Sequence, residues 1–252
     1  MTAQDSATQE TTLVRRFFPE SEIDNFSNIS GTVQFYLKVK ALYGDANPRV
    51  LDFGAGRGAW VELETSRTVR SLRDLRNGAR EVVAADVDPA VLANRCSHSQ
   101  IVFDPAAALP FADNSFDLIV ADFVFEHIEE PQRVADELLR ILRPGGWICA
   151  RTANKYGYVA IGSRLIPNRR HVRSLHAIQP TRLEQDVFPT AYKLNTPRQI
   201  AQHFAGRKLI YYRNSAEPSY HFNRRWIYRL FLALHRLLPD QFATGLCVFV
   251  QK

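Results

Sequence analysis

The chain has 252 residues, of which 46% are hydrophobic and 23% are charged. That composition is typical of a globular protein and excludes a disordered or fibrous chain, and the length suffices to bury a full core. Three widely spaced cysteines exclude a disulfide framework and a zinc-binding cysteine pattern. The first twelve residues are polar, so we expect no signal peptide and a cytoplasmic protein.

Charge is distributed unevenly along the chain. Residues 1–150 carry 15 Lys and Arg against 22 Asp and Glu, whereas residues 151–252 carry 17 against 4. The basic second part predicts contact with an anionic partner such as nucleic acid, a phosphorylated small molecule or an acidic membrane surface. The alternative is that its arginines pair with acidic residues of the first part.

Apolar strands alternate with helical stretches from residue 49 onward, after a helical pattern over 32–43. Continuously apolar runs such as 118–121 are typical of parallel strands that are covered on both faces. The alternation predicts a doubly wound, mostly parallel α/β sheet of seven strands. Strands are expected at 49–53, 81–86, 100–103, 116–121, 147–152, 208–212 and 246–250, with helices within 59–76, from Pro89, near 131–142 and from Pro197.

The alternation of strands and helices ends after residue 153, where Arg, Tyr, His and Pro accumulate without periodicity. We expect this segment to form a lid over the carboxyl edge of the sheet, where ligands of open α/β sheets bind. Thr196 is expected to cap the next helix, with Pro197 at its first position. The predicted organisation is a single domain, 1–252, with an N-terminal helical cap (1–48), a core (49–153), a lid (154–196) and a C-terminal part (197–252) that contains a basic amphipathic helix (221–238).

Three glycines stand directly after the strand predicted at 49–53. Glycine lets the backbone turn sharply there and lets a ligand approach closely, because no Cβ intervenes. The spacing is G-x-G-x-G rather than the G-x-G-x-x-G of dinucleotide-binding enzymes. An acidic residue two positions earlier can hold the loop or meet a cationic ligand. The predicted ligand loop therefore comprises Asp52, Gly54, Gly56 and Gly58.

A second acidic residue, Asp86, closes the strand predicted at 81–86. A carboxylate at that position can accept hydrogen bonds from both hydroxyls of a ribose. Asp86 follows Gly54 by 32 positions, against about 20 in nicotinamide enzymes, and a longer intervening helix would account for the difference. We predict that Asp86 binds a ribose and that Asp88 caps the helix from Pro89.

Four segments follow one another in order: VLDFGAGRG, VVAADVDP, LPFADNSFDLIVADFVFEHIEEP and LRPGG. This set, over about residues 49–153, resembles the class I S-adenosylmethionine (SAM)-dependent methyltransferases, particularly the small-molecule group that includes quinone-biosynthesis enzymes. The resemblance implies a Rossmann-like methyltransferase fold that binds SAM, with its methionine end on the glycine loop and its ribose on Asp86. It also implies an adenine contact from Asp104 and the backbone near Ala106, although that loop is one residue longer than usual.

The segment after the fourth strand lies next to the transferred methyl group in that family. Methyl transfer is an in-line displacement, so alignment of the acceptor supplies most of the acceleration. A hydroxyl acceptor also benefits from a general base with a pKa near 7, and His127 is the only imidazole in the four segments. We predict His127 as that base, against the alternative of a packed histidine, and we predict that Glu126 orients either His127 or the substrate. Some relatives bind magnesium here, but Phe123 replaces their additional carboxylate, so we predict no metal.

Beyond residue 153 the resemblance weakens. Asparagine and tyrosine side chains there are predicted to line the acceptor pocket, because tyrosine combines an apolar body with a polar tip. Arginines of the following segment are predicted to bind an anionic group of the substrate, against the alternative of a solvated basic loop. The predicted substrate-binding residues are Asn154, Tyr156, Tyr158, Arg169 and Arg170.

The helix predicted at 221–238 carries apolar residues at every fourth position, with arginines on other faces. Such a stripe is typical of a core or a subunit interface. A basic amphipathic helix can also lie on an anionic membrane, so peripheral contact with the inner membrane surface is an alternative. The sequence leaves the oligomeric state open.

We predict methyl transfer from SAM to a small or lipid-linked acceptor, either neutral or anionic, with O-methylation favoured. The alternatives are a non-catalytic SAM-binding or assembly protein and a nicotinamide-dependent oxidoreductase, which the glycine spacing disfavours. A nucleic-acid substrate, including RNA, ranks lower, because no RNA-binding module and no Asn/Asp-Pro-Pro-Tyr segment accompany the basic part.

Overall fold

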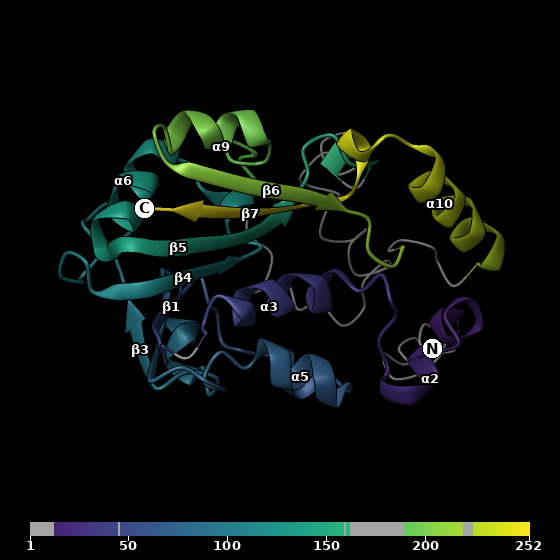
Figure 1. Cartoon of the computed structure of the whole chain (residues 1–252), viewed down its shortest axis with the longest axis horizontal. Helices are drawn as coiled ribbons and strands as arrows, with labels where there is room; N and C mark the ends of the chain where they lie inside the picture. Colours follow the sequence, from purple (N-terminus) through teal and green to yellow (C-terminus); the bar gives the residue numbers. More distant parts are fainter. Residues whose placement is uncertain (1–12, 45, 159, 162–188, 219–223) are drawn as a thin grey trace. The chain divides into compact units, whose positions relative to one another are not determined.

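The computed structural model describes residues 13–44, 46–158, 160–161, 189–218 and 224–252 (Figure 1). The chain divides into two compact units that are interleaved in sequence. The sheet unit consists of Thr32–Thr152, Thr190–Tyr212 and Leu246–Lys252, and the helix unit of Met1–Gly31, Ala153–Pro189 and Arg213–Gly245. The expected single domain therefore stays a prediction.

The sheet has seven strands in the order β3-β2-β1-β4-β5-β7-β6 (Figure 1). The pairs β1–β2, β1–β4, β2–β3 and β4–β5 are all parallel, which confirms the predicted fold class. Strand order reverses between β1 and β4, and ligands of open α/β sheets bind at such a switch point. The strands are β1 (Arg49–Phe53), β2 (Glu81–Asp86), β3 (Ser99–Val102), β4 (Phe116–Asp122), β5 (Leu142–Ala153), β6 (Lys208–Asn214) and β7 (Gly245–Gln251).

Apolar side chains cover both faces of the sheet, because successive residues of a strand point to opposite sides. Leu51 and Phe53 belong to one buried cluster and Val50 to the other. Helices α6 (Pro131–Ile141) and α9 (Pro197–His203) contribute to the first cluster, and α3 (Gly31–Ala41) contributes to the second. This packing fixes the carboxyl ends of β1, β2 and β4, where the predicted site residues lie.

Local capping explains where several helices begin. The Thr196 hydroxyl accepts from the amide of Gln199 and starts α9 at Pro197, as predicted. The single helix expected within 59–76 is instead two helices, α4 (Trp60–Leu63) and α5 (Arg67–Arg73), because Ser66 caps a new start. The segment from Pro89 is a 3-10 helix, η1 (Pro89–Ala93), capped by Asp88.

The helix unit contains α2 (Ser21–Asp24), α10 (Arg225–Leu237) and the short turn η4 (Asp240–Phe242). Where a helix is predicted at 221–238, the structure has α10 at Arg225–Leu237, and residues 221–223 lie outside the described part of the chain. Most of the predicted lid, including Arg169 and Arg170, also lies outside it. None of the helices in the described ranges is long and apolar enough to cross a membrane.

Candidate functional site

The glycine loop turns at the carboxyl end of β1. Gly54 and Gly56 have φ angles of 71° and 53°, in the left-handed region that favours glycine. The Gly54 amide donates to the carbonyl of Ala85 over 2.7 Å, and a Cβ on Gly54 would lie 2.4 Å from Val124. At Gly56 a Cβ would meet nothing within 4 Å, so the loop is open to a ligand there.

Asp86 joins the second strand to this loop. One carboxylate oxygen accepts from the Gly56 amide over 2.8 Å, and the other accepts from the Asp88 amide over 2.9 Å. Only 9% of Asp86 is exposed. Because each carboxylate oxygen has a second lone pair, Asp86 retains acceptor capacity for two hydroxyls. The predicted glycine loop and the predicted ribose-binding carboxylate are therefore in direct contact.

Asn94, which the sequence analysis missed, clamps the loop from the other side. Its amide group donates to the carbonyl of Gly56 over 2.9 Å, and a Cβ on Gly58 would lie 2.8 Å from its side-chain oxygen. Asn94 ends the 3-10 helix η1, where asparagine is an ordinary turn residue. No sequence signal marks it, because its contacts are with the glycine loop, about 40 residues earlier in the chain.

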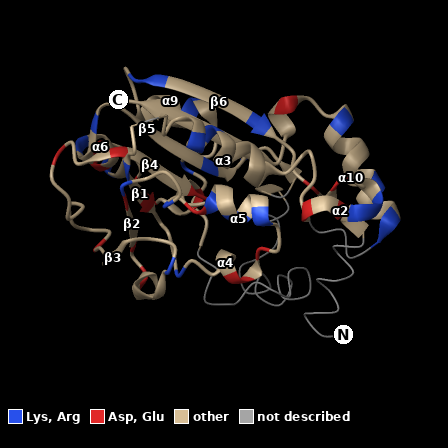
Figure 2. Cartoon of the chain, turned by 60° about the horizontal axis from the view of Figure 1, so that its bottom comes forward, with Lys and Arg blue, Asp and Glu red and all other residues tan. Residues whose placement is uncertain are grey.

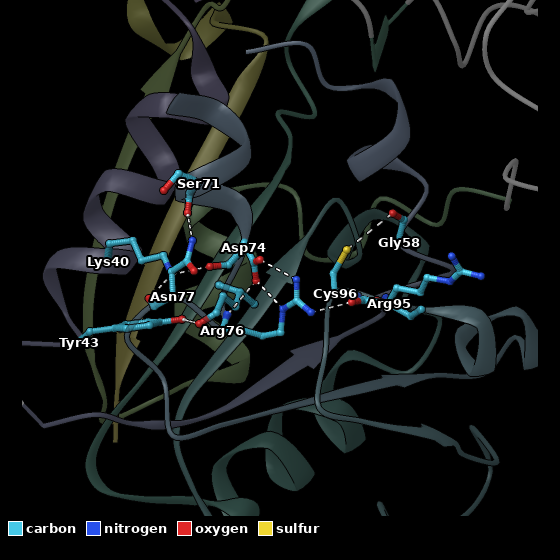
Figure 3. A network of polar contacts seen from close by, with 11 residues as sticks. Lys40, Tyr43, Gly58, Ser71, Asp74, Arg76, Asn77, Arg95 and Cys96 are labelled. Atoms are coloured by element: carbon cyan, nitrogen blue, oxygen red, sulfur yellow. Dashed lines mark hydrogen bonds and ion pairs between the residues drawn. The ribbon is translucent and has the colours of Figure 1, made fainter. Parts of the chain in front are cut away.

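A polar network braces the segments beside the loop (Figure 3). Arg76 pairs with Asp74 at 2.7 Å and donates to the carbonyl of Arg95 over 2.8 Å. Lys40 on α3 donates to the carbonyl of Asp74 over 2.7 Å. The turn after α5 is thereby tied to α3 and to the segment that follows Asn94, which supports the glycine loop.

Asp52, at the end of β1, has an unusual carboxyl group. Burial, the carboxylate of Asp122 and, more weakly, that of Asp86 raise the pKa of Asp52 to about 7, although Arg73 opposes this shift. Among the described residues, none forms a hydrogen bond with this carboxyl group. A half-buried carboxyl without such a partner suits a cationic ligand group.

Asp122, by contrast, is fully paired at the end of β4. The Arg151 guanidinium contacts both of its oxygens, at 2.6 and 2.7 Å, and the Tyr36 hydroxyl donates to it over 3.0 Å. Burial alone would raise the pKa of Asp122, but the pairing with Arg151 outweighs it and holds the pKa below its usual value. Asp122 stays ionised, and its charge acts on Asp52.

Phe123 follows this pair with a φ of 58°, which is rare for a bulky residue. Its ring is 48% exposed and lies 4.7 Å from the Arg151 guanidinium. Strained residues of this kind cluster at ligand sites. From the sequence, Phe123 indicated only that a metal-binding carboxylate is absent at this position.

His127 and Glu126 belong to the same short turn, η2 (Phe125–His127), but their surroundings differ. The Glu126 carboxyl is buried and accepts from the Thr152 hydroxyl over 2.7 Å, and burial raises its pKa. Asn195 donates to the same hydroxyl over 2.7 Å. His127 is half-buried. Its role as a base stays a prediction, as does the orienting role of Glu126.

Asp104 closes a local turn, in which its carboxylate accepts from the Ala106 amide over 2.8 Å. Both residues are exposed. The adenine contact predicted for this loop stays a prediction. Where the described chain is concerned, no group of three His, Cys, Asp or Glu residues has the arrangement of a metal site.

The remaining predicted substrate residues lie in the helix unit. Asn154 is fully buried, and its amide group donates to the carbonyls of Gln241 and Ala243, so it braces the segment before β7. Tyr156 is 52% exposed. Tyr158 stacks on Phe231 and helps to line a cavity of about 220 Å³ within the same unit. Their substrate roles stay predictions.

Residues 51–150 match the family described as "Methyltransferase domain". This part of the chain is a class I SAM-dependent methyltransferase domain. SAM is the methyl donor of that family.

The methyltransferase domain is also similar to curated relatives. A demethylmenaquinone methyltransferase of Renibacterium salmoninarum is 33% identical over 44% of this chain and 43% of its own length. A malonyl-[acyl-carrier protein] O-methyltransferase of Coxiella burnetii is 28% identical over 44% and 39%. The chain thus spans less than half the length of these relatives.

A solved SAM-dependent methyltransferase from Mesorhizobium loti shares the fold, with a TM-score of 0.54 at 16% identity over 88% of this chain and 99% of that one. At this identity the likeness concerns the fold alone. It agrees with the seven-stranded sheet of the methyltransferase domain.

Proposed function

We propose that this protein transfers the methyl group of SAM to a hydroxyl of a small or lipid-linked acceptor. The observation that carries the proposal is the junction of the glycine loop with Asp86, where Gly56 is open and the carboxylate keeps free lone pairs. SAM, when bound, supplies the electrophilic methyl group. Asp52 provides a negative charge for its ammonium group, and Asp86 receives its ribose hydroxyls.

On the acceptor side, His127 takes the proton of the attacking hydroxyl, and Phe123 provides an exposed apolar wall. The relatives named above methylate a quinone precursor and an acyl group carried on a protein, going by their names. A lipid-linked acceptor would place the reaction at a membrane surface. An element of the chain that binds lipid would therefore support this part of the proposal.

Transfer of label from methyl-labelled SAM tests the proposal, with aqueous and lipid extracts of the source organism as acceptors. We expect a labelled product that base hydrolysis or mass spectrometry identifies as an O-methyl compound. His127→Gln should lower turnover by about 10²–10⁴-fold and leave SAM affinity unchanged, whereas His203→Gln, at a half-buried histidine of α9, should match the wild type. SAM binding without any labelled product would refute methyl transfer and favour a non-catalytic SAM-binding protein.

A further inference from the structure

Helix α10 leaves an apolar stripe in solvent. Trp226 is 65% exposed, Leu230 50% and Leu237 81%, and Ala233 between them is also exposed. Their spacings of four, three and four residues place them on one face of the helix. Single exposed apolar residues are ordinary, but a continuous row that includes tryptophan marks an interaction surface.

The other face of α10 is already used for packing. Tyr228 is fully buried and its ring stacks on Phe17 at 4.8 Å. Phe231 stacks on Tyr158 at 4.8 Å, and the Tyr158 hydroxyl lies 3.3 Å from His235. The helix is thus fixed within its unit by this face, and the apolar stripe needs a different partner.

Arginines line one edge of the stripe. Arg225, Arg229 and Arg236 are exposed and lie at spacings of four and seven residues, so they form a row beside the apolar residues. Basic segments recur along α10 in Figure 2, and Arg225–Leu237 contains no acidic residue. None of the three forms an ion pair with an acidic residue in the described part of the chain.

We propose that α10 lies on an anionic lipid bilayer, with Trp226, Leu230 and Leu237 in the acyl boundary and the arginines at the headgroups. An apolar face flanked by cationic residues and ending in tryptophan fits this interface, where amphipathic helices bind through apolar area and attraction to anionic lipids. A protein partner would need acids that match the arginine row. The proposal is independent of methyl transfer, and it is tested without SAM.

Sedimentation of the purified full chain with vesicles tests the proposal. We expect binding to phosphatidylcholine vesicles that contain phosphatidylglycerol, little binding to phosphatidylcholine alone, and weakening as salt is raised. The variant Arg225→Gln/Arg229→Gln/Arg236→Gln should bind about a hundredfold more weakly, at about fivefold per arginine. The control Arg198→Gln/Arg207→Gln/Lys208→Gln, which loses the same charge from exposed positions of the sheet unit, should bind as the wild type does.

A second test variant with a matched control examines the apolar stripe. Trp226→Gln/Leu237→Gln should lose binding, whereas Leu63→Gln/Leu92→Gln, at 62% and 63% exposed leucines of the sheet unit, should retain it. Melting temperatures within a few degrees of the wild type would show that each variant folds. Equal losses in test and control variants, or no binding to anionic vesicles, would overturn the proposal.

A fluorescent label at Ala233→Cys gives a direct readout of insertion. Cys96, Cys149 and Cys247 are all buried, so the introduced thiol reacts selectively. The label should shift to the blue with anionic vesicles. A shift that instead follows protein concentration in the absence of lipid would identify the stripe as a self-association surface and would contradict the proposal.

Discussion

Asp52 offers the sharpest prediction, because the pKa of its carboxyl group is raised to about 7, so that the group gains a proton as pH falls below neutral. Its pKa of about 7 comes first from burial and then from the charge of Asp122, which Arg151 keeps ionised. We expect SAM, through its ammonium group, to bind the ionised form of Asp52. Below pH 7 the carboxyl must release a proton before it can pair with the ligand.

The size of the effect follows from proton linkage. Each pH unit below 7 weakens SAM binding tenfold, or about 1.4 kcal/mol, so affinity at about pH 5 should be about a hundredfold lower than at about pH 8. In the absence of SAM, folding stability depends on pH in the opposite direction to SAM affinity. The folded pKa exceeds the ordinary value of 3.8, so the contribution of Asp52 to stability is complete below that value and is lost as pH rises through 7. That loss is at most about 4 kcal/mol.

Isothermal calorimetry across this pH range, in buffers of different ionisation enthalpy, measures both the affinity and the protons released. Asp52→Asn should remove the pH dependence, bind SAM weakly at about pH 8, and leave the ligand-free protein more stable there. A wild-type affinity that does not change with pH, or an Asp52→Asn variant that keeps the same slope, would refute the reasoning.

Three further substitutions test the surroundings of the loop. Asp86→Ala should weaken SAM binding by about 1–3 kcal/mol, measured by the same calorimetry, and an unchanged affinity would exclude Asp86 from the ribose site. Gly54→Ala should lower both SAM affinity and melting temperature, because its Cβ meets Val124 at 2.4 Å, and Gly54→Ala/Val124→Ala should recover part of the loss. The absence of any recovery would show that this contact is not the cause. Arg151→Met should reduce the free energy of unfolding by about 3–5 kcal/mol in urea titrations, since it leaves Asp122 charged and buried. Arg151→Met/Asp122→Leu should cost less than the single change, and a larger cost would argue against a charge effect.

The fold was predictable because its signals are local and repeated. Apolar runs such as 118–121, the glycines after β1 and the Thr196–Pro197 cap each determine the structure of their own segment. The division of the helix expected within 59–76 was not predicted, because a single serine such as Ser66 is also compatible with a continuous helical pattern. Its capping hydrogen bond outweighs the apolar periodicity around it.

The site was predictable only where residues follow strand ends. Gly54, Gly56 and Asp86 were predicted in this way, and the hydrogen bond between Gly56 and Asp86 shows that they lie together, while their role in binding SAM stays a prediction. Asn94 and Arg151 were missed, because each acts on a group from a distant segment through the folded sheet. The charge state of Asp52 was equally hidden, since it depends on burial and on Asp122.

We propose that the glycine loop and Asp86 together form the SAM site. Amide NMR spectra of the labelled protein, titrated with S-adenosylhomocysteine, test this claim residue by residue. We predict that the largest shifts occur at Gly54, Gly56 and the amide of Asp88, which donates to the Asp86 carboxylate. Shifts confined to other segments, or none at saturating ligand, would contradict the claim.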